Sequence, residues 1–195
     1  IAALCAATKA PISIDTMKPA VARAAMSAGA SIWNDVLALR GPGAVETAAS
    51  LHRPVILMHM QGEPGTMQND PRYDDVVADV IAFLKERAAA AKAIGVERVW
   101  VDPGIGFGKT LAHNLALIAN LGRIKEETGC PVVLGASRKR FIQAIDETAA
   151  DAGVSRLGGS VAAALIGAQN GAAMVRVHDV AETVQALKVW RALAV

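Results

Sequence analysis

The stretch from Val99 to Thr110 combines an apolar strand, a carboxylate and a glycine-rich turn. It reads VWVDPGIGFGKT, so the apolar segment leads directly into Asp102, which is followed by a proline and three glycines. α/β proteins present polar groups in this order at the carboxyl end of a sheet, and glycine lets a flat ligand approach the backbone closely. Spacing excludes two phosphate-binding motifs. Pro103 occupies the first glycine position of a Walker A loop, and Lys109 the third glycine position of a dinucleotide fingerprint.

Polar side chains follow the other predicted strands as well. In chain order, the strand-end residues are Asp15, Asn34, His59, Asp102, Ser137 with Lys139, and Arg176 with His178. The carboxylates and the asparagine can accept hydrogen bonds from N–H groups, whereas the lysine, the arginine and the last histidine can bind an anion, with Arg138 and Arg140 nearby. A carboxylate that accepts two parallel N–H bonds recognises an amidine-like edge. The pattern therefore predicts a planar, nitrogen-rich ligand that carries a phosphate-type group.

The elements that position these residues alternate along the chain. The predicted strands are Pro11–Ile14, Ala30–Trp33, Pro54–Met58, Arg98–Val101, Pro131–Leu134 and Ala172–Val177. The predicted helices run from Pro19 to the stop at Gly29, over Gly43–Leu51, Asp74–Ile94, Asn114–Thr128, Phe141–Asp146 and Ser160–Gln169, and from a cap at Asp179 to about Ala192. Strands without a polar face that alternate with helices indicate a parallel sheet covered on both sides.

An open doubly wound sheet and a TIM barrel both fit this pattern. A (β/α)8 barrel needs eight units and about 250 residues, whereas this chain of 195 residues shows six. The chain begins IAALCAATKA, without Met, and these residues read as the end of a helix. We therefore expect an α/β TIM (β/α)8 barrel of which residues 1–195 form a single, N-terminally incomplete domain with about six βα units.

Composition narrows the class of partner. The chain is 53% hydrophobic, has a net charge of +2 and is only 4% aromatic, so nothing in it favours a nucleic-acid surface. No apolar run reaches the roughly 18 residues of a membrane span, so we expect no membrane partner. Cys5 and Cys130 form no CxxC pair, which fits a reducing compartment and predicts a cytoplasmic protein.

Six segments together resemble the dihydropteroate synthase family. They read SIDTMKP, WNDV, LMHMQGEPGTM, DPGIGFGKT, GASRKRF and RVHDV, and they occur in the family's order over essentially the whole chain. The resemblance implies a pterin-binding TIM barrel that joins dihydropterin pyrophosphate to 4-aminobenzoate and releases pyrophosphate. It further implies Mg²⁺ as cofactor and a homodimer. The family's first two strands, whose loops carry an Asn near Mg²⁺ and a Thr-Arg-Pro segment over the aminobenzoate, have no counterpart in this sequence, so we expect no metal ligand in this chain.

The resemblance also implies a role for each matching residue. The pterin would be held by Asp15, Asn34, Asp102 and Lys139. The pyrophosphate would be held by Arg176 and His178. Met60, Phe107 and Gly135 would contact substrate in the pocket, and the Ser137–Arg140 turn would lie near the aminobenzoate. The catalytic set is then Asp15, Asp102, Lys139, Arg176 and His178, with no protein nucleophile, and Ser137 is interpreted as a turn residue.

Three alternatives remain open at this point. A pterin-binding methyltransferase domain would share the pterin carboxylates but would use a corrinoid partner. A non-catalytic pterin-binding fragment would keep the same contacts without turnover. A metal-dependent hydrolase would use His59, His178 and Asp102 as ligands, although such enzymes usually also need a His-x-His pair on the first strand. We further expect the 195 residues alone to form no efficient synthase.

Overall fold

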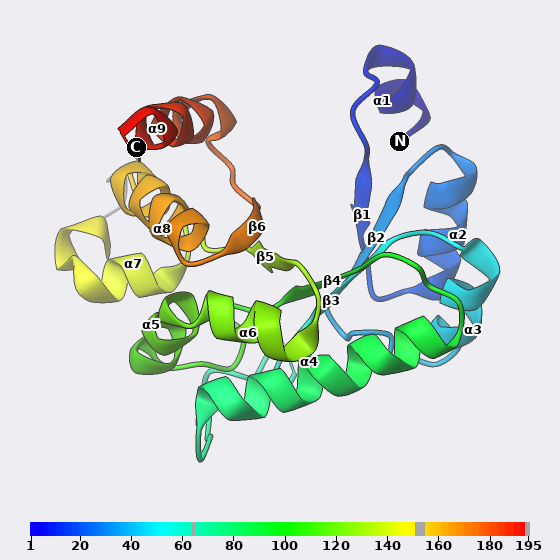
Figure 1. Cartoon of the computed structure of the whole chain (residues 1–195), viewed down its shortest axis with the longest axis horizontal. Helices are drawn as coiled ribbons and strands as arrows, with labels where there is room; N and C mark the ends of the chain where they lie inside the picture. Colours follow the sequence, from blue (N-terminus) through cyan, green and yellow to red (C-terminus); the bar gives the residue numbers. More distant parts are fainter. Residues whose placement is uncertain (64, 151–154, 194–195) are drawn as a thin grey trace.

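Six parallel strands form one curved sheet in chain order (Figure 1). The computed structural model describes residues 1–63, 65–150 and 155–193. Pro64, in the predicted LMHMQGEPGTM motif, lies outside the described residues. The strands are β1 (Ser13–Asp15), β2 (Ile32–Asp35), β3 (Val55–Met58), β4 (Val99–Asp102), β5 (Val132–Leu134) and β6 (Ala172–Val175). All six predicted strands are confirmed, and the polar ends of β2 and β4 prove to be the last residues of the strands themselves.

The helices follow the sheet around its outer side, from α2 at one edge to α9 at the other (Figure 1). They are α1 (Ala2–Ala7), α2 (Pro19–Ser27), α3 (Ala44–Leu51), α4 (Val76–Ala93), α5 (Leu111–Ala119), α6 (Leu121–Thr128), α7 (Arg140–Ile145), α8 (Leu157–Gln169) and α9 (Val180–Leu193), with a 3-10 turn at Glu147–Ala150. The predicted starts have clear causes. Pro19 occupies the first turn of α2, and the Asp75 carboxylate accepts from Val77 N and Ala78 N at the start of α4.

The hydrophobic core lies between the sheet and these helices. Trp33, Leu57, Leu84 and Val101 are among its fully buried side chains. The register places Asp15 beside Asn34 and Met58 beside Asp102. The carboxyl ends of neighbouring strands therefore reach the same edge of the sheet, as a parallel arrangement requires.

Two expectations about the elements were wrong. The single helix predicted over Asn114–Thr128 is two helices, because the chain turns at Asn120, whose side-chain Nδ2 donates to Ala116 O at 2.8 Å. The sheet is also not covered on both sides throughout. β3 and β5 are buried along their whole length, whereas the edge strands β1 and β6 are partly exposed. Within the described residues each of these two strands pairs along one edge only, so its other edge has no neighbouring strand.

The described helices also bear on the membrane expectation. Over residues 1–63, 65–150 and 155–193, no helix is both long enough and apolar enough to cross a bilayer.

Candidate active site

Asp102 lies at the centre of the strand ends and is 2% exposed. Its backbone carbonyl accepts from His59 N at 3.0 Å, which ties β4 to the end of β3. Its Oδ1 accepts from Gly104 N at 2.7 Å, so the glycine-rich turn fixes the carboxylate. Burial raises the pKa of Asp102, while the Gly104 hydrogen bond and the nearby cations, Arg176 foremost, act in the opposite direction. A buried acid of this kind gains from a ligand that donates N–H groups to it.

Asn34 supplies a second buried polar group at this edge. Its Nδ2 is the one buried side-chain nitrogen or oxygen that lacks a hydrogen-bond partner among the described residues. Buried amides are normally paired, so this orphan donor marks a place where a ligand would complete the hydrogen bonding. The adjacent Asp35 is different, because its two oxygens accept from Leu37 N and Leu39 N and it serves the loop after β2.

An ion pair between Arg176, which follows β6, and Asp15, which ends β1, connects the two edges of the sheet. The Nη1 atom of Arg176 lies 3.0 Å from Oδ2 of Asp15, although the two residues are predicted to bind different parts of one ligand. Gly135 lies against this side chain, since a Cβ there would stand 3.1 Å from Nη2 of Arg176 and 3.5 Å from Oδ2 of Asp102. A cavity of about 410 Å³ opens beside the pair and is also lined by Asn34.

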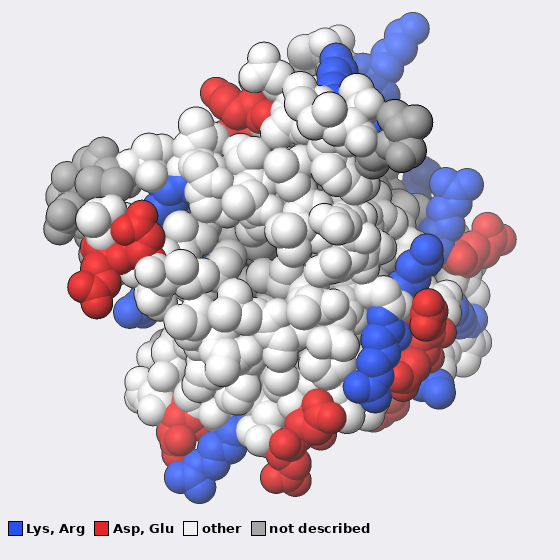
Figure 2. Space-filling model, turned by 60° about the vertical axis from the view of Figure 1, so that its left-hand side comes forward, with Lys and Arg blue, Asp and Glu red and all other residues white. Residues whose placement is uncertain are grey.

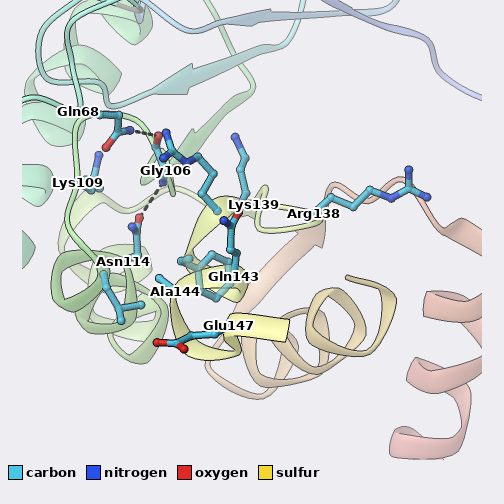
Figure 3. A pocket seen from close by; sticks show the side chains of 12 residues that line it. Gln68, Gly106, Lys109, Asn114, Arg138, Lys139, Gln143, Ala144 and Glu147 are labelled. Carbon is cyan, nitrogen blue, oxygen red and sulfur yellow. Dashed lines mark hydrogen bonds between the residues drawn. The ribbon is translucent and has the colours of Figure 1, made fainter. Parts of the chain in front are cut away.

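Lys139 lies beside Phe107 and lines a second cavity. The Lys139 Nζ lies 4.1 Å from the centre of the Phe107 ring, within cation–π distance. Burial lowers the pKa of Lys139, and Arg176 lowers it further. The second cavity has a volume of about 580 Å³ (Figure 3). Its wall includes Gly106, whose N donates to Asn114 Oδ1 at 2.7 Å, and Gln68, whose Nε2 donates to Gly106 O.

His178 is exposed, and its position is set by Ser137. The Ser137 Oγ lies 2.9 Å from His178 Nδ1 and accepts from His178 N at 3.2 Å. The interpretation of Ser137 as only a turn residue was therefore incomplete, because its hydroxyl contacts a predicted anion-binding side chain. Residues 137 and 178 lie in different loops, and no local pattern in the sequence could reveal this contact.

Lys109 is a buried residue of the site region that the sequence did not assign. Its Nζ lies 3.0 Å from His59 Nδ1 and 3.0 Å from Phe107 O. Burial lowers the pKa of Lys109 to about 7 and that of His59 to about 3. The only sequence signal for a role of Lys109 was its place in GFGKT, directly after a glycine-rich turn that packs on the β3 loop. A Cβ at Gly104 would overlap the carbonyl oxygen of His59.

His59 does not form a metal site with His178. Its ring packs edge-on against Phe83, with ring centres 4.9 Å apart, and its Nδ1 faces Lys109. Among the described residues no three His, Cys, Asp or Glu side chains are arranged to hold a metal. The hydrolase hypothesis therefore loses its proposed ligand set. Met60 is buried at the end of β3, and its contact with substrate stays a prediction.

Parallel strands that bring a buried carboxylate, an unpaired amide and several cations to one edge define an α/β-barrel type of ligand site. The match to known families gives this site a more specific identity. The chain belongs to the pterin binding enzyme family, whose model matches residues 1–178.

Relatives and solved structures agree with this assignment. The chain is 46% identical over 186 residues to the dihydropteroate synthase of Haemophilus influenzae, and the match covers 94% of this chain and 66% of that protein. The crystal structure of dihydropteroate synthase from Stenotrophomonas maltophilia matches with a TM-score of 0.92 at 52% identity, over 98% of this chain and 72% of that one. The Xanthomonas albilineans enzyme in complex with 7,8-dihydropteroate matches with a TM-score of 0.90 at 50% identity, over all of this chain and 73% of that one. This chain thus spans slightly under two thirds of the length of its Haemophilus relative.

Proposed function

We propose that this chain carries the pterin and diphosphate subsites of a dihydropteroate synthase. The observation that carries the proposal is the meeting of two buried and incompletely hydrogen-bonded side chains, Asp102 and Asn34, with the cations Lys139 and Arg176 and the imidazole of His178 at one edge of the sheet. The first pair suits the amino and N–H edge of a pterin, and the cations suit a diphosphate. The Xanthomonas albilineans structure contains 7,8-dihydropteroate, which is the product of the dihydropteroate synthase reaction.

The reaction needs charge stabilisation and positioning, with no protein nucleophile. The bond between the pterin methylene carbon and the diphosphate oxygen breaks, and its electron pair leaves on the oxygen. The nitrogen lone pair of 4-aminobenzoate forms the new C–N bond, and the nitrogen then loses a proton. In this proposal Asp102 and Asn34 orient the ring, and Arg176 and His178 stabilise the charge that develops on the leaving group.

The second cavity is the proposed entry side for 4-aminobenzoate. It is lined by Lys139 (Figure 3) and by Arg140, and the Lys139 Nζ lies over the Phe107 ring. A flat aromatic acid could stack near the ring, and the cationic side chains could receive its carboxylate.

The test is a pair of measurements on the 195-residue chain. Calorimetry should detect binding of 6-hydroxymethyl-7,8-dihydropterin pyrophosphate, and this binding should be stronger than that of the pterin without its diphosphate. Chromatography should then follow formation of 7,8-dihydropteroate. Absence of pterin binding by the folded chain would overturn the proposal, and binding without turnover would favour the non-catalytic alternative.

Mg²⁺ remains a proposal. Mg²⁺ commonly binds through one or two carboxylates together with substrate phosphates. The described residues provide no cluster of three His, Cys, Asp or Glu side chains for a metal, so a Mg²⁺ ion would be held mainly by the substrate diphosphate, and no step of the reaction is derived through it. A cytosolic location is likewise proposed, supported by the unpaired thiols of Cys5 and Cys130.

We infer that two copies associate through the face formed by α5, α7 and α8. An apolar cavity of about 430 Å³ lies there between Leu115, Phe141, Ile145 and Ile166. The side of the molecule with α7 to α9 carries few charged side chains in its middle (Figure 2). Exposed apolar area of this kind marks association surfaces.

Light scattering tests the association. Ile166, which is 48% exposed, would be replaced by Glu, and this substitution should shift the mass from dimer toward monomer. Val21→Glu on the distant helix α2 is the matched control, because Val21 is similarly exposed. A monomeric wild-type chain would contradict the inference.

A further inference from the structure

The Ser137 hydroxyl makes two contacts with a single residue, His178. Ser137 follows β5 and is 5% exposed, so its hydroxyl is shielded from water. Its Oγ accepts from His178 N at 3.2 Å and lies 2.9 Å from Nδ1 of the same imidazole. The two residues come from different loops, one after β5 and one after β6, and the contacts hold these loops together at the cationic part of the site.

The protons of this pair can be assigned by counting donors and acceptors. A serine hydroxyl has one proton and two lone pairs. The His178 backbone N–H uses one lone pair, so the hydroxyl proton still needs an acceptor in a buried place. Among the described residues, Nδ1 of His178 is the only acceptor within hydrogen-bond distance of this hydroxyl. The Ser137 hydroxyl therefore donates to Nδ1, and the neutral imidazole carries its proton on Nε2.

We propose that Ser137 is a positioning residue that selects the Nε2–H tautomer of His178, so that the exposed side of the ring offers a donor to a phosphoryl oxygen. In the other tautomer the Nε2 lone pair would face the anion and repel it. The consequence for ligand binding rests on the proposed function, because that function supplies the diphosphate. The tautomer itself follows from the contacts alone.

Contacts of the neighbouring residue Arg138 fix the position of Ser137. Arg138 has a φ of +58°, a left-handed conformation that is uncommon for a side chain of this size. Its backbone N donates to Ser160 Oγ at 2.9 Å, and its guanidinium binds both carboxylate oxygens of Asp179, the residue after His178. Figure 3 shows the Arg138 side chain directed away from that of Lys139. The turn and the His178 loop are thus clamped on both sides of the Ser137 hydroxyl.

Nitrogen-15 NMR of the histidine rings tests the tautomer without any substrate. The spectrum is recorded at a pH where His178 is neutral, and His178→Asn identifies its signals among the four histidines. In the wild-type chain we expect Nδ1 to resonate as an unprotonated nitrogen and Nε2 as a protonated one. Ser137→Ala should shift both signals toward a mixture of tautomers, and Ser137→Thr, which keeps the hydroxyl, should restore them.

Ser160→Ala is the matched control, because it removes the hydroxyl of helix α8 that accepts from Arg138 N and has no contact with the imidazole. It should leave the His178 ring signals unchanged, whereas a purely structural effect would move them as much as Ser137→Ala does. Inorganic pyrophosphate binding should weaken about threefold to tenfold in Ser137→Ala, as expected for the loss of one hydrogen bond.

Two results would overturn the inference. One is a wild-type ring protonated on Nδ1, and the other is an unchanged ring spectrum in Ser137→Ala. Failure of the proposed function has a different signature. The wild-type chain would then show the expected tautomer but would not bind pyrophosphate. Ser137 would still select the tautomer of His178, but the tautomer would have no role in diphosphate binding.

Discussion

At the scale of single residues, the buried carboxylate of Asp102 should lower the stability of the folded chain and strengthen the proposed pterin binding. Burial holds its pKa above the ordinary value of 3.8, so the folded chain binds more protons than the unfolded chain between that value and the raised pKa. The free energy of unfolding therefore falls as the pH rises through this window. Asp102→Asn should raise the unfolding free energy at pH 7, while pterin binding weakens by about 2–5 kcal/mol. Urea denaturation and calorimetry measure the two effects, and unchanged pterin affinity would contradict the assignment.

Arg176 should recognise the diphosphate rather than the pterin ring. Its ion pair with Asp15 is about half exposed, and such pairs contribute little to stability. Arg176→Ala should therefore cost little stability but should weaken pyrophosphate-bearing ligands by roughly 1.5–3 kcal/mol, the range for a hydrogen bond to a charged group. Free pterin should lose much less. Arg23→Ala on helix α2 serves as the control, and equal losses for both ligands would place Arg176 in a purely structural pair.

At the scale of elements, Lys109 joins the end of β3 to the turn after β4. Its pKa is lowered to about 7 from 10.5, so between these values the unfolded chain binds more protons than the folded one. The unfolding free energy should therefore rise with pH from about 7 to 10.5, because deprotonation removes the cost of a buried charge. His59 titrates in a separate window, between about 3 and 6.5.

Urea denaturation from pH 7 to pH 10 would check this prediction against Lys109→Met, which lacks the titrating group. The difference in unfolding free energy between wild type and variant should change in favour of wild type as the pH rises. A difference that stays constant would show that the Lys109 ammonium is well solvated or well compensated in the folded chain.

The same scale shows what a single sequence can predict here. Strand ends such as Asp15 and Asp102 follow from local patterns, because an apolar run and the turn after it are adjacent in the chain. The contacts of Lys109 with His59 and of Ser137 with His178 join residues 50 and 41 positions apart. They depend on how loops pack across the sheet, so neither hydrophobic periodicity nor turn signals contain them. The break at Asn120 was missed for a different reason. It involves a local hydrogen bond from the Asn120 side chain to Ala116 O, which hydrophobic periodicity does not encode.

At the scale of the whole molecule, the open sheet limits what the chain can do by itself. β1 and β6 each lack a second neighbour among the described residues, and the chain spans 66% of its Haemophilus influenzae relative. Unpaired strand edges favour aggregation, and catalysis of this kind gains from loops that exclude water. Most of the predicted pterin-binding residues lie together in this chain. We therefore expect this chain alone to bind pterin but to form dihydropteroate slowly.

Adding the parts of the Haemophilus influenzae enzyme that lie outside the matched region, by fusion or co-expression, should increase dihydropteroate formation by a large factor. The pterin affinity should change much less, because the buried carboxylate and amide that we propose to bind the ring are already in place. The same addition to the Asp102→Asn variant is the control and should give little turnover, since the ring is no longer held. Equal rates for the chain with and without the added segments would show that six strands suffice, and would overturn the expectation that this chain alone is an inefficient synthase.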